Sequence, residues 1–83
     1  MIKILKNPEN IKQRILLGGI FEINNELYTA KKDINKNIHT VNKINGKFYG
    51  YIILNNENAI FIRTYLGKQI KRNVKYDEIL VFQ

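Results

Sequence analysis

The chain has 83 residues and contains no cysteine, no serine, one proline and one histidine. Because cysteine is absent, neither disulfides nor a zinc site built on thiolates can brace the fold. Stability must then come from an apolar core, and self-association is one way to enlarge that core. A chain of this length is expected to form one domain, residues 1–83, with little room for an active-site cleft.

Groups for catalysis are equally scarce. No carboxylate lies within five residues of the only histidine, His39, and a general base or a metal ligand needs such groups close by. We interpret His39 as a structural or surface residue. Asp77 and Glu78 are the one adjacent carboxylate pair, and neighbours in a strand point to opposite faces. The sequence therefore predicts no catalytic residues, no metal site, no cofactor and a protein that is not an enzyme.

Long apolar runs are also missing. The opening segment, residues 1–5, is interrupted at once by Lys6, Asn7 and Pro8, which makes it too short for a signal peptide. No other run approaches the length that spans a membrane. We expect a cytoplasmic protein that makes no use of a membrane.

Positive charge is what the chain has in excess. Fourteen Lys and Arg against seven Asp and Glu give a formal net charge of +7, which is typical of proteins that bind phosphate-bearing partners. Eleven of the fourteen are Lys, however, and the chain also holds fifteen Ile and twelve Asn, the residues that AT-rich codons produce. The positive charge can therefore reflect the base composition of the gene or selection for binding to a polyanion, and both explanations remain open.

The first element expected is a helix over residues 8–17. Residues 7–9, Asn-Pro-Glu, combine a side chain that caps free backbone N–H groups, a residue suited to the first helical position and a carboxylate that complements the helix dipole. Ile11 and Ile15 then recur at helical spacing, and Gly18-Gly19 supplies the left-handed residue that commonly ends a helix.

After residue 19 the pattern becomes β. Apolar alternation between short polar turns predicts strands over residues 20–23, 27–31, 38–44, 47–54, 59–66 and 69–76, with 79–82 closing the sheet or pairing with an edge. The polar segment 32–37 is predicted to be a loop. The fold class predicted is mainly β, with one short N-terminal helix and five to six strands. Its architecture is either a small SH3-like or Sm-like barrel or a strongly curved antiparallel sheet.

The central hairpin predicts a register. Asn45-Gly46 favours a two-residue type I′ turn, which puts Ile44 opposite Lys47. One face then carries Thr40, Asn42, Lys47, Tyr49 and Tyr51, and the other, which resembles a core, carries Val41, Phe48, Ile52 and Leu54. A four-residue loop at 55–58 brings Leu54 beside Ala59, Ile52 beside Phe61, and both Ile60 and Ile62 to the tyrosine face. Both faces are then apolar, so either the loop differs in length by one residue or the helix or another subunit covers the second face.

Residues 44–52, Ile-Asn-Gly-Lys-Phe-Tyr-Gly-Tyr-Ile, are followed late in the chain by 75–79, Lys-Tyr-Asp-Glu-Ile, and both come after the predicted helix. Over about half the chain this pattern resembles that of the Sm-like family, in which a helix also precedes the strands. Two departures stand out, because the spacing from Asn-Gly to the next Gly is one residue shorter and Asp77 stands where a histidine is sought. We carry over neither ring assembly nor base-binding residues from the resemblance.

Aromatic and basic residues gather in and beside the central strands. The basic ones are Lys68, Lys71, Arg72, Lys75 and Arg63, and the aromatic ones that accompany them are Tyr49, Tyr51 and Tyr65. Proteins that bind single strands stack bases on aromatic rings and hold the backbone with Lys and Arg, whereas aromatic residues also favour strands in any protein. The sequence favours a non-enzymatic protein that binds single-stranded nucleic acid or RNA through these eight residues.

Two alternatives stay open. A short, AT-rich, single domain is typical of accessory proteins from phages and other mobile elements. The chain can therefore be a protein-binding module or inhibitor whose apolar sheet occludes a host nucleic-acid-handling or defence protein. It can also be a structural homo-oligomer. Salt-sensitive binding to nucleic acid favours the first hypothesis, a partner recovered from nuclease-treated lysate favours the second, and a monomer at all concentrations excludes the third.

Overall fold

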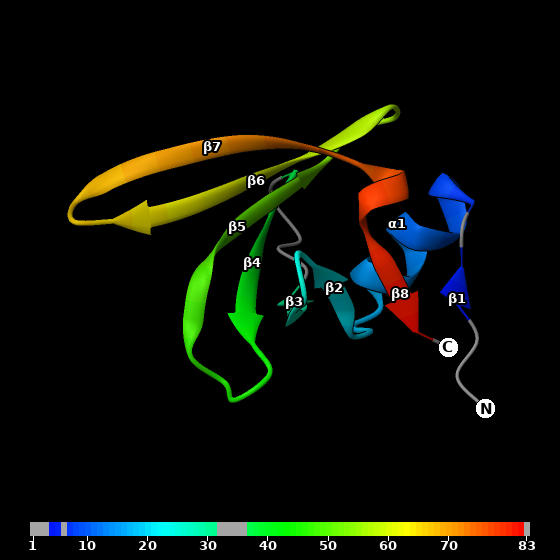
Figure 1. Ribbon diagram of the computed structural model, residues 1–83, viewed down its shortest axis with the longest axis horizontal. Coiled ribbons are helices and arrows are strands. Elements are labelled where there is room, and N and C mark those ends of the chain that lie inside the picture. The colour runs from blue at the N-terminus through cyan, green and yellow to red at the C-terminus, as the bar shows by residue number, and fades with distance from the viewer. Residues whose placement is uncertain (1–3, 6, 32–36, 83) are drawn as a thin grey trace.

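The computed structural model describes residues 4–5, 7–31 and 37–82, and in these ranges it shows one antiparallel sheet of eight strands with one short α-helix. Strand order across the sheet is β1-β8-β2-β3-β4-β5-β6-β7 (Figure 1). In chain order the elements are β1 (Ile4–Leu5), α1 (Pro8–Leu16), β2 (Phe21–Ile23), β3 (Glu26–Lys31), β4 (Ile38–Lys43), β5 (Phe48–Leu54), β6 (Asn58–Tyr65), β7 (Lys68–Lys75), the 3₁₀ turn η1 (Tyr76–Glu78) and β8 (Leu80–Phe82). The predicted mainly β class is confirmed. The strand count exceeds the expected five to six because the short β1 and β8 join the sheet.

The helix α1 begins and is buried as its sequence predicts. The side-chain oxygen of Asn7 accepts a hydrogen bond from the backbone N–H of Glu9 at 2.9 Å, which satisfies one of the free donors of the first turn. Ile11 and Ile15, four residues apart and therefore on one side, are both 0% exposed. Their stripe anchors α1 on the sheet, where it packs against β3, β8 and η1.

The end of α1 is set by two glycines. Gly18 takes a left-handed φ of 85°, its N–H donates to the carbonyl of Ile15 at 3.1 Å, and the N–H of Gly19 donates to the carbonyl of Arg14 at 2.9 Å. These paired bonds are the Schellman motif, which satisfies the last free carbonyls of a helix. The Arg14 side chain then donates to the carbonyl of Phe82 at 3.2 Å and ties the helix to β8.

The sheet is open and strongly curled. Strands β1 and β7 lie at its two edges, so the curved antiparallel sheet, and not a closed barrel, is the architecture adopted. A Cβ atom at Gly50, in the middle of β5, would lie 1.9 Å from the carbonyl oxygen of Ile62 on β6. Only glycine permits that approach of two strands. The adjacent β-bulge between Val41 and Asn42 adds to the bend, and the result is a half-barrel.

The turn between β4 and β5 corrects the sequence prediction. The N–H of Gly46 donates to the carbonyl of Lys43, the N–H of Lys43 donates to the carbonyl of Lys47, both at 2.8 Å, and Gly46 has φ of 90°. This is a three-residue loop with one left-handed glycine, so the two-residue type I′ turn with Ile44 opposite Lys47 is wrong. The Asn45 side chain accepts the N–H of Lys47 at 3.0 Å, which favours the longer loop.

A bulge then restores the predicted register, but it places Phe48 and Tyr49 on the faces opposite to those predicted. Beyond the bulge Thr40 pairs with Tyr51 as predicted, and before it Asn42 pairs with Phe48, which leaves Tyr49 as the extra residue. Phe48 was expected in the core but is 54% exposed, and its ring contacts that of Tyr51 at 5.5 Å. Tyr49 instead packs against the core.

The pairing of β5 with β6 confirms the predicted register, although the loop between the two strands is one residue shorter, 55–57, because β6 begins at Asn58. Leu54 pairs with Ala59, and Tyr51 with Ile62, as the sequence predicts. Ile11 and Ile15 of α1 belong to the same buried core as Ile52 and Phe61, which lie on the concave side, so the outer side carries its apolar residues without the helix. Both faces of the central strands are therefore apolar.

The first and last described strands pair with each other in the sheet. Strand β8 lies between β1 and β2, where Val81 pairs with Phe21 and both are 0% exposed, so the predicted pairing of the last strand is confirmed. His39 is buried and lies opposite Ile52. The predicted loop 32–37 falls outside the described residues except for Asn37. Within the described ranges, no helix combines the length and apolarity needed to cross a bilayer.

Candidate functional site

The hairpin of β6 and β7 extends beyond the rest of the sheet (Figure 1). Strand β5 pairs with β6 only as far as Gly50 opposite Arg63, so past this point β6 has β7 as its sole paired strand. Every residue from 63 to 73 is exposed, whereas Ile62 and Val74, which flank this stretch, are buried. We call residues 63–73 the arm.

Strand alternation divides the predicted site residues between two faces of the sheet. Five of them share the concave face: Tyr49, Arg63, Tyr65, Lys68 and Arg72. The outer face receives the other three: Tyr51, Lys71 and Lys75. The basic run in β7 is therefore not one patch, because neighbouring residues of a strand point in opposite directions.

An aromatic cluster supports the foot of the arm on the concave face. The Tyr28 ring lies 4.8 Å from that of Tyr49 and 5.1 Å from that of Phe61, measured between centroids, and Tyr49 and Phe61 are 5.1 Å apart. Such tilted and edge-to-face contacts stabilise a fold beyond the area that they bury. The cluster therefore holds β3, β5 and β6 together at the base of the arm.

Arginine continues this stack along the arm. The Arg63 guanidinium lies 4.8 Å from the centroid of the Tyr65 ring and 6.0 Å from that of Tyr49, and the Lys43 ammonium lies 5.9 Å from Tyr49. Cations held over rings in this way keep their charge exposed to a ligand while their stems pack. The concave face thus presents alternating planar and cationic groups.

A hollow of about 310 Å³ lies where the arm meets the body. Its lining combines apolar, amide and charged side chains: Ile23, Asn24, Glu26, Tyr28, Tyr49, Phe61, Arg63, Ile70 and Arg72. Burial, followed by a hydrogen bond with Tyr49 and by the charges of Tyr49 and Glu26, raises the pKa of Tyr28 well above its usual value. Tyr28 therefore stays a neutral hydroxyl beside the hollow.

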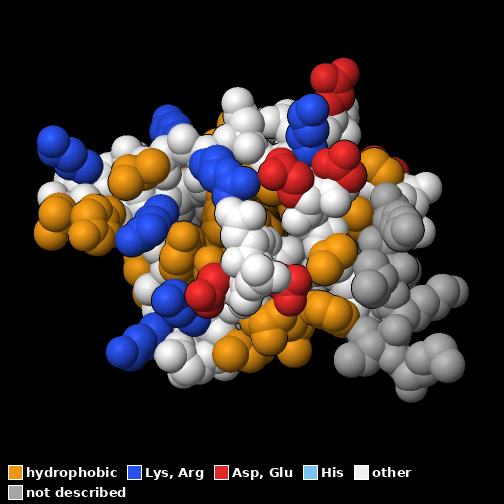
Figure 2. All heavy atoms as spheres, viewed as in Figure 1, with side chains coloured by type: hydrophobic (Ala, Val, Ile, Leu, Met, Phe, Trp, Pro, Cys, Tyr) orange, Lys and Arg blue, Asp and Glu red, His pale blue; other side chains and the backbone are white. Residues whose placement is uncertain are grey.

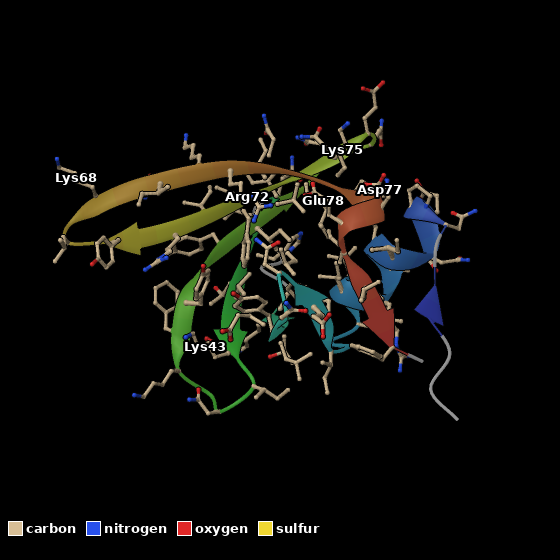
Figure 3. The ribbon with its side chains drawn as sticks, in the orientation of Figure 1. Lys43, Lys68, Arg72, Lys75, Asp77 and Glu78 are labelled. Carbon is tan, nitrogen blue, oxygen red and sulfur yellow. The ribbon has the colours of Figure 1, made fainter. Side chains whose placement is uncertain are left out.

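The junction of arm and body is partly neutralised. The Arg72 guanidinium lies 3.3 Å from a carboxylate oxygen of Glu78, and the other oxygen accepts the backbone N–H of Lys75 at 2.9 Å. Figure 3 shows Arg72 close to Glu78 in η1 and Lys68 at the far end of the arm. Figure 2 shows Lys and Arg spread over the half of the molecule that holds the arm, with most Asp and Glu nearer its middle and other side.

A second hollow, of about 350 Å³, lies on the outer face. It is mostly apolar with a polar edge, and its lining residues are Ile38, Thr40, Tyr51, Ile53, Ile62, Gln69 and Lys71. It is formed by the apolar face that α1 leaves uncovered.

Three residues of the site were not singled out from the sequence: Lys43, Leu66 and Ile70. The alternation of β7 places Ile70 with Lys68 and Arg72, so the strand pattern contained a signal for it. The position of Lys43 over Tyr49 depends on the bulge, for which we find no signal in the sequence. The exposure of Leu66 depends on where β5 ends.

The arrangement suits binding by charge and stacking. Lys and Arg attract phosphates, and exposed rings and guanidinium planes stack on bases. Among the described residues, no group of three or more His, Asp or Glu side chains is placed to hold a metal ion. Comparison with protein-family models, with curated proteins and with solved structures finds no match for this chain.

Proposed function

We propose that this chain is a non-enzymatic protein that binds single-stranded nucleic acid or RNA along the concave face of the arm. One observation carries the proposal: Arg63, stacked on Tyr65, shares this face with Lys68 and Arg72. In this arrangement phosphates meet the cations, and bases meet the rings and the guanidinium plane.

Counterion release supplies a first test. The probe is a fluorescent oligonucleotide, either poly(U) or oligo(dT). We expect the logarithm of the association constant to fall linearly with the logarithm of the salt concentration, with a slope set by the number of phosphates contacted. Anisotropy titrations at several salt concentrations measure that slope. No binding to either polymer at low salt would overturn the proposal.

Two lysines of β7 form a matched pair for locating the strand. Lys68→Gln and Lys71→Gln remove the same charge from the same hairpin, but on opposite faces. For a single strand on the concave face, the Lys68 variant lowers the magnitude of the salt slope by about 1, and the Lys71 variant leaves it unchanged. Equal effects would show that the charge acts only through the overall field.

A second candidate function is supported by the outer hollow. We propose as the alternative that this apolar face docks a protein, as a host-directed inhibitor would require. A tagged chain that recovers one stoichiometric protein from nuclease-treated lysate, and loses it on Ile53→Asp substitution, would favour this alternative. Light scattering across protein concentrations tests whether the occupant is instead a second copy, as in a structural homo-oligomer.

A further inference from the structure

The end of the arm combines an unusual backbone with an unusual side chain. Leu66 and Gly67 close the hairpin with φ of 51° and 76°, the pair of left-handed residues of a type I′ turn. Leu66 is 83% exposed, the largest exposed fraction among the large apolar side chains described. A left-handed conformation is unfavourable for an ordinary L-residue, and asparagine adopts it more easily.

Neither cost is explained by the fold. The β2–β3 hairpin of the same chain closes with Asn24 and Asn25 at φ of 52° and 66°. Asparagine therefore fits this turn geometry elsewhere in the chain, whereas the β6–β7 turn has leucine. Leucine at the apex neither eases the turn nor contributes to the core. A strained, exposed apolar residue at the end of a projecting element is typical of a group that inserts into a ligand.

The two faces of the arm are both basic. Arg63 and Lys68 lie on the concave face, Lys71 lies on the outer face, and no Asp or Glu occurs between residues 63 and 73. A single strand on the concave face makes no use of Lys71, of the apex or of the outer hollow with its Tyr51 ring. The arrangement has one apolar apex, with Arg63, Lys68 and Arg72 on the concave side and Lys71, followed by Lys75 just below the arm, on the outer side.

We propose that the arm binds nucleic acid where a duplex opens into two strands, with Leu66 against the last base pair and one strand along each face. This inference rests on the proposed function and specifies its substrate. An aliphatic side chain can cover the exposed flat surface of a terminal base pair, as apolar wedges do at unstacked base steps. The phosphates of the two diverging strands then meet Arg63 and Lys68 on one side and Lys71 on the other.

The test compares three substrates of one sequence at one salt concentration: a forked duplex with two single-stranded tails, a blunt duplex and a single strand. DNA and RNA versions are both used, because the inference concerns shape. We expect the wild-type chain to bind the fork about tenfold more tightly than the single strand or the blunt duplex, the scale of one stacked base. The dissociation constants come from anisotropy titrations.

Substitution of the apex separates insertion from charge. Leu66→Asn converts the turn to Asn-Gly, which suits its backbone, so the variant folds with a melting temperature no lower than that of the wild type. We expect it to lose the tenfold preference for the fork while its affinity for the single strand changes less than twofold. Leu17→Asn is the matched control, because Leu17 is 80% exposed at the end of α1, away from the arm.

Two further readouts bear on the same model. In the wild type, 2-aminopurine at the terminal base pair of the fork should change fluorescence on binding, and in the Leu66→Asn variant it should not. Lys71→Gln should weaken binding to the fork and leave binding to the single strand unchanged. A variant that weakens both substrates equally would contradict the two-track model.

The outcomes distinguish this inference from the proposed function. Equal wild-type affinity for fork and single strand would overturn the inference and leave single-strand binding intact. No binding to any substrate would remove both. A third outcome combines no preference for the fork with binding to vesicles of phosphatidylserine and phosphatidylcholine by the wild type but not by Leu66→Asn. It would assign the leucine to a lipid surface and overturn the inference.

Discussion

The two ends of the β6–β7 hairpin share strands, pairing and alternation but differ in what surrounds them. At the base, Ala59 and Val74 are paired and both are 0% exposed; on the arm, Arg63 and Ile70 are paired and Ile70 is 50% exposed. The base has β5 beside it, and its Ala59 and Val74 belong to the same buried core as Ile11 and Ile15 of α1, whereas no residue of the arm belongs to that core. Alternation therefore decides which face a side chain occupies, and the neighbouring elements decide whether that face is buried. Substitutions at the base should change stability, and those on the arm should change binding.

The largest effect is expected at Gly50, where the body begins to curl. A methyl group there would overlap the backbone of β6, 1.9 Å from the Ile62 oxygen, and backbone cannot move aside as a flexible side chain can. Gly50→Ala should lower the free energy of unfolding by at least about 4 kcal/mol, a large share of the total for a chain of this size. Circular dichroism in urea measures this. A folded variant of wild-type stability would mean that β5 and β6 do not approach so closely.

A matched isoleucine pair sharpens the contrast. Ile52, in the middle of β5, is 0% exposed, and Ile70, on the arm, is 50% exposed. Ile52→Ala should cost about 3 kcal/mol because it removes buried methyl groups and leaves a cavity, whereas Ile70→Ala should cost less than about 1 kcal/mol. Equal losses in urea melts would show that the arm folds against something in solution.

Tyr76 tests the junction through pH. Its hydroxyl donates to the carbonyl of Asn55, and burial, with the charge of Glu9 second, raises its pKa to about 12. The folded chain holds this proton between pH 10 and 12, where the unfolded chain releases it, so this contribution to stability is complete below pH 10 and is lost as pH rises to 12. Tyr76→Phe should cost about 1 kcal/mol at neutral pH and reduce the alkaline fall.

The wild type and the Tyr76→Phe variant should therefore approach one another in stability between pH 10 and 12. All other ionisable groups are the same in both chains, so their effects cancel in the comparison. If the plots of stability against pH stay parallel for the two chains, the pKa of Tyr76 in the folded chain is close to that of an unfolded tyrosine.

The smallest effect is expected at the apex and has the opposite sign. Leu66→Asn should raise the free energy of unfolding by about 0.5 kcal/mol, because asparagine adopts the left-handed conformation at less cost. Thermal melts of the variant and of the Leu17→Asn control measure it. A loss of stability would show that the leucine packs on the hairpin after all.

Local signals were sufficient for most of the fold. The cap at Asn7 and the glycines at 18–19 bounded the helix, and the sequence pattern located seven of the eight described strands, all except β1, to within about two residues. The turn at 44–46 was missed because Asn-Gly fits two loops that differ by one residue, and the choice depends on the twist and bulge of the whole hairpin. The bulge compensated for the turn, so Thr40 and Tyr51 were paired correctly while Phe48 and Tyr49 exchanged faces.

The candidate site was predictable in kind but not in arrangement. Composition indicated Lys, Arg and Tyr in the last strands, and alternation alone separates Lys68 from Lys71. The length of the arm was not predictable, because it depends on where β5 stops pairing with β6, which is a property of the curled sheet. Lys43 was missed for a related reason, since the bulge places Tyr49 beneath it.

The position of β8 also governs when this protein can fold. Val81 pairs with Phe21, which is 60 residues earlier, and β8 supplies the strand that separates β1 from β2. During synthesis the first strands and the helix therefore wait, with their apolar sides uncovered, until the final strand leaves the ribosome. Contacts between such distant residues make folding slow. A tag placed directly after β8, or directly before its partner β1, lies beside the strand pairs that form last.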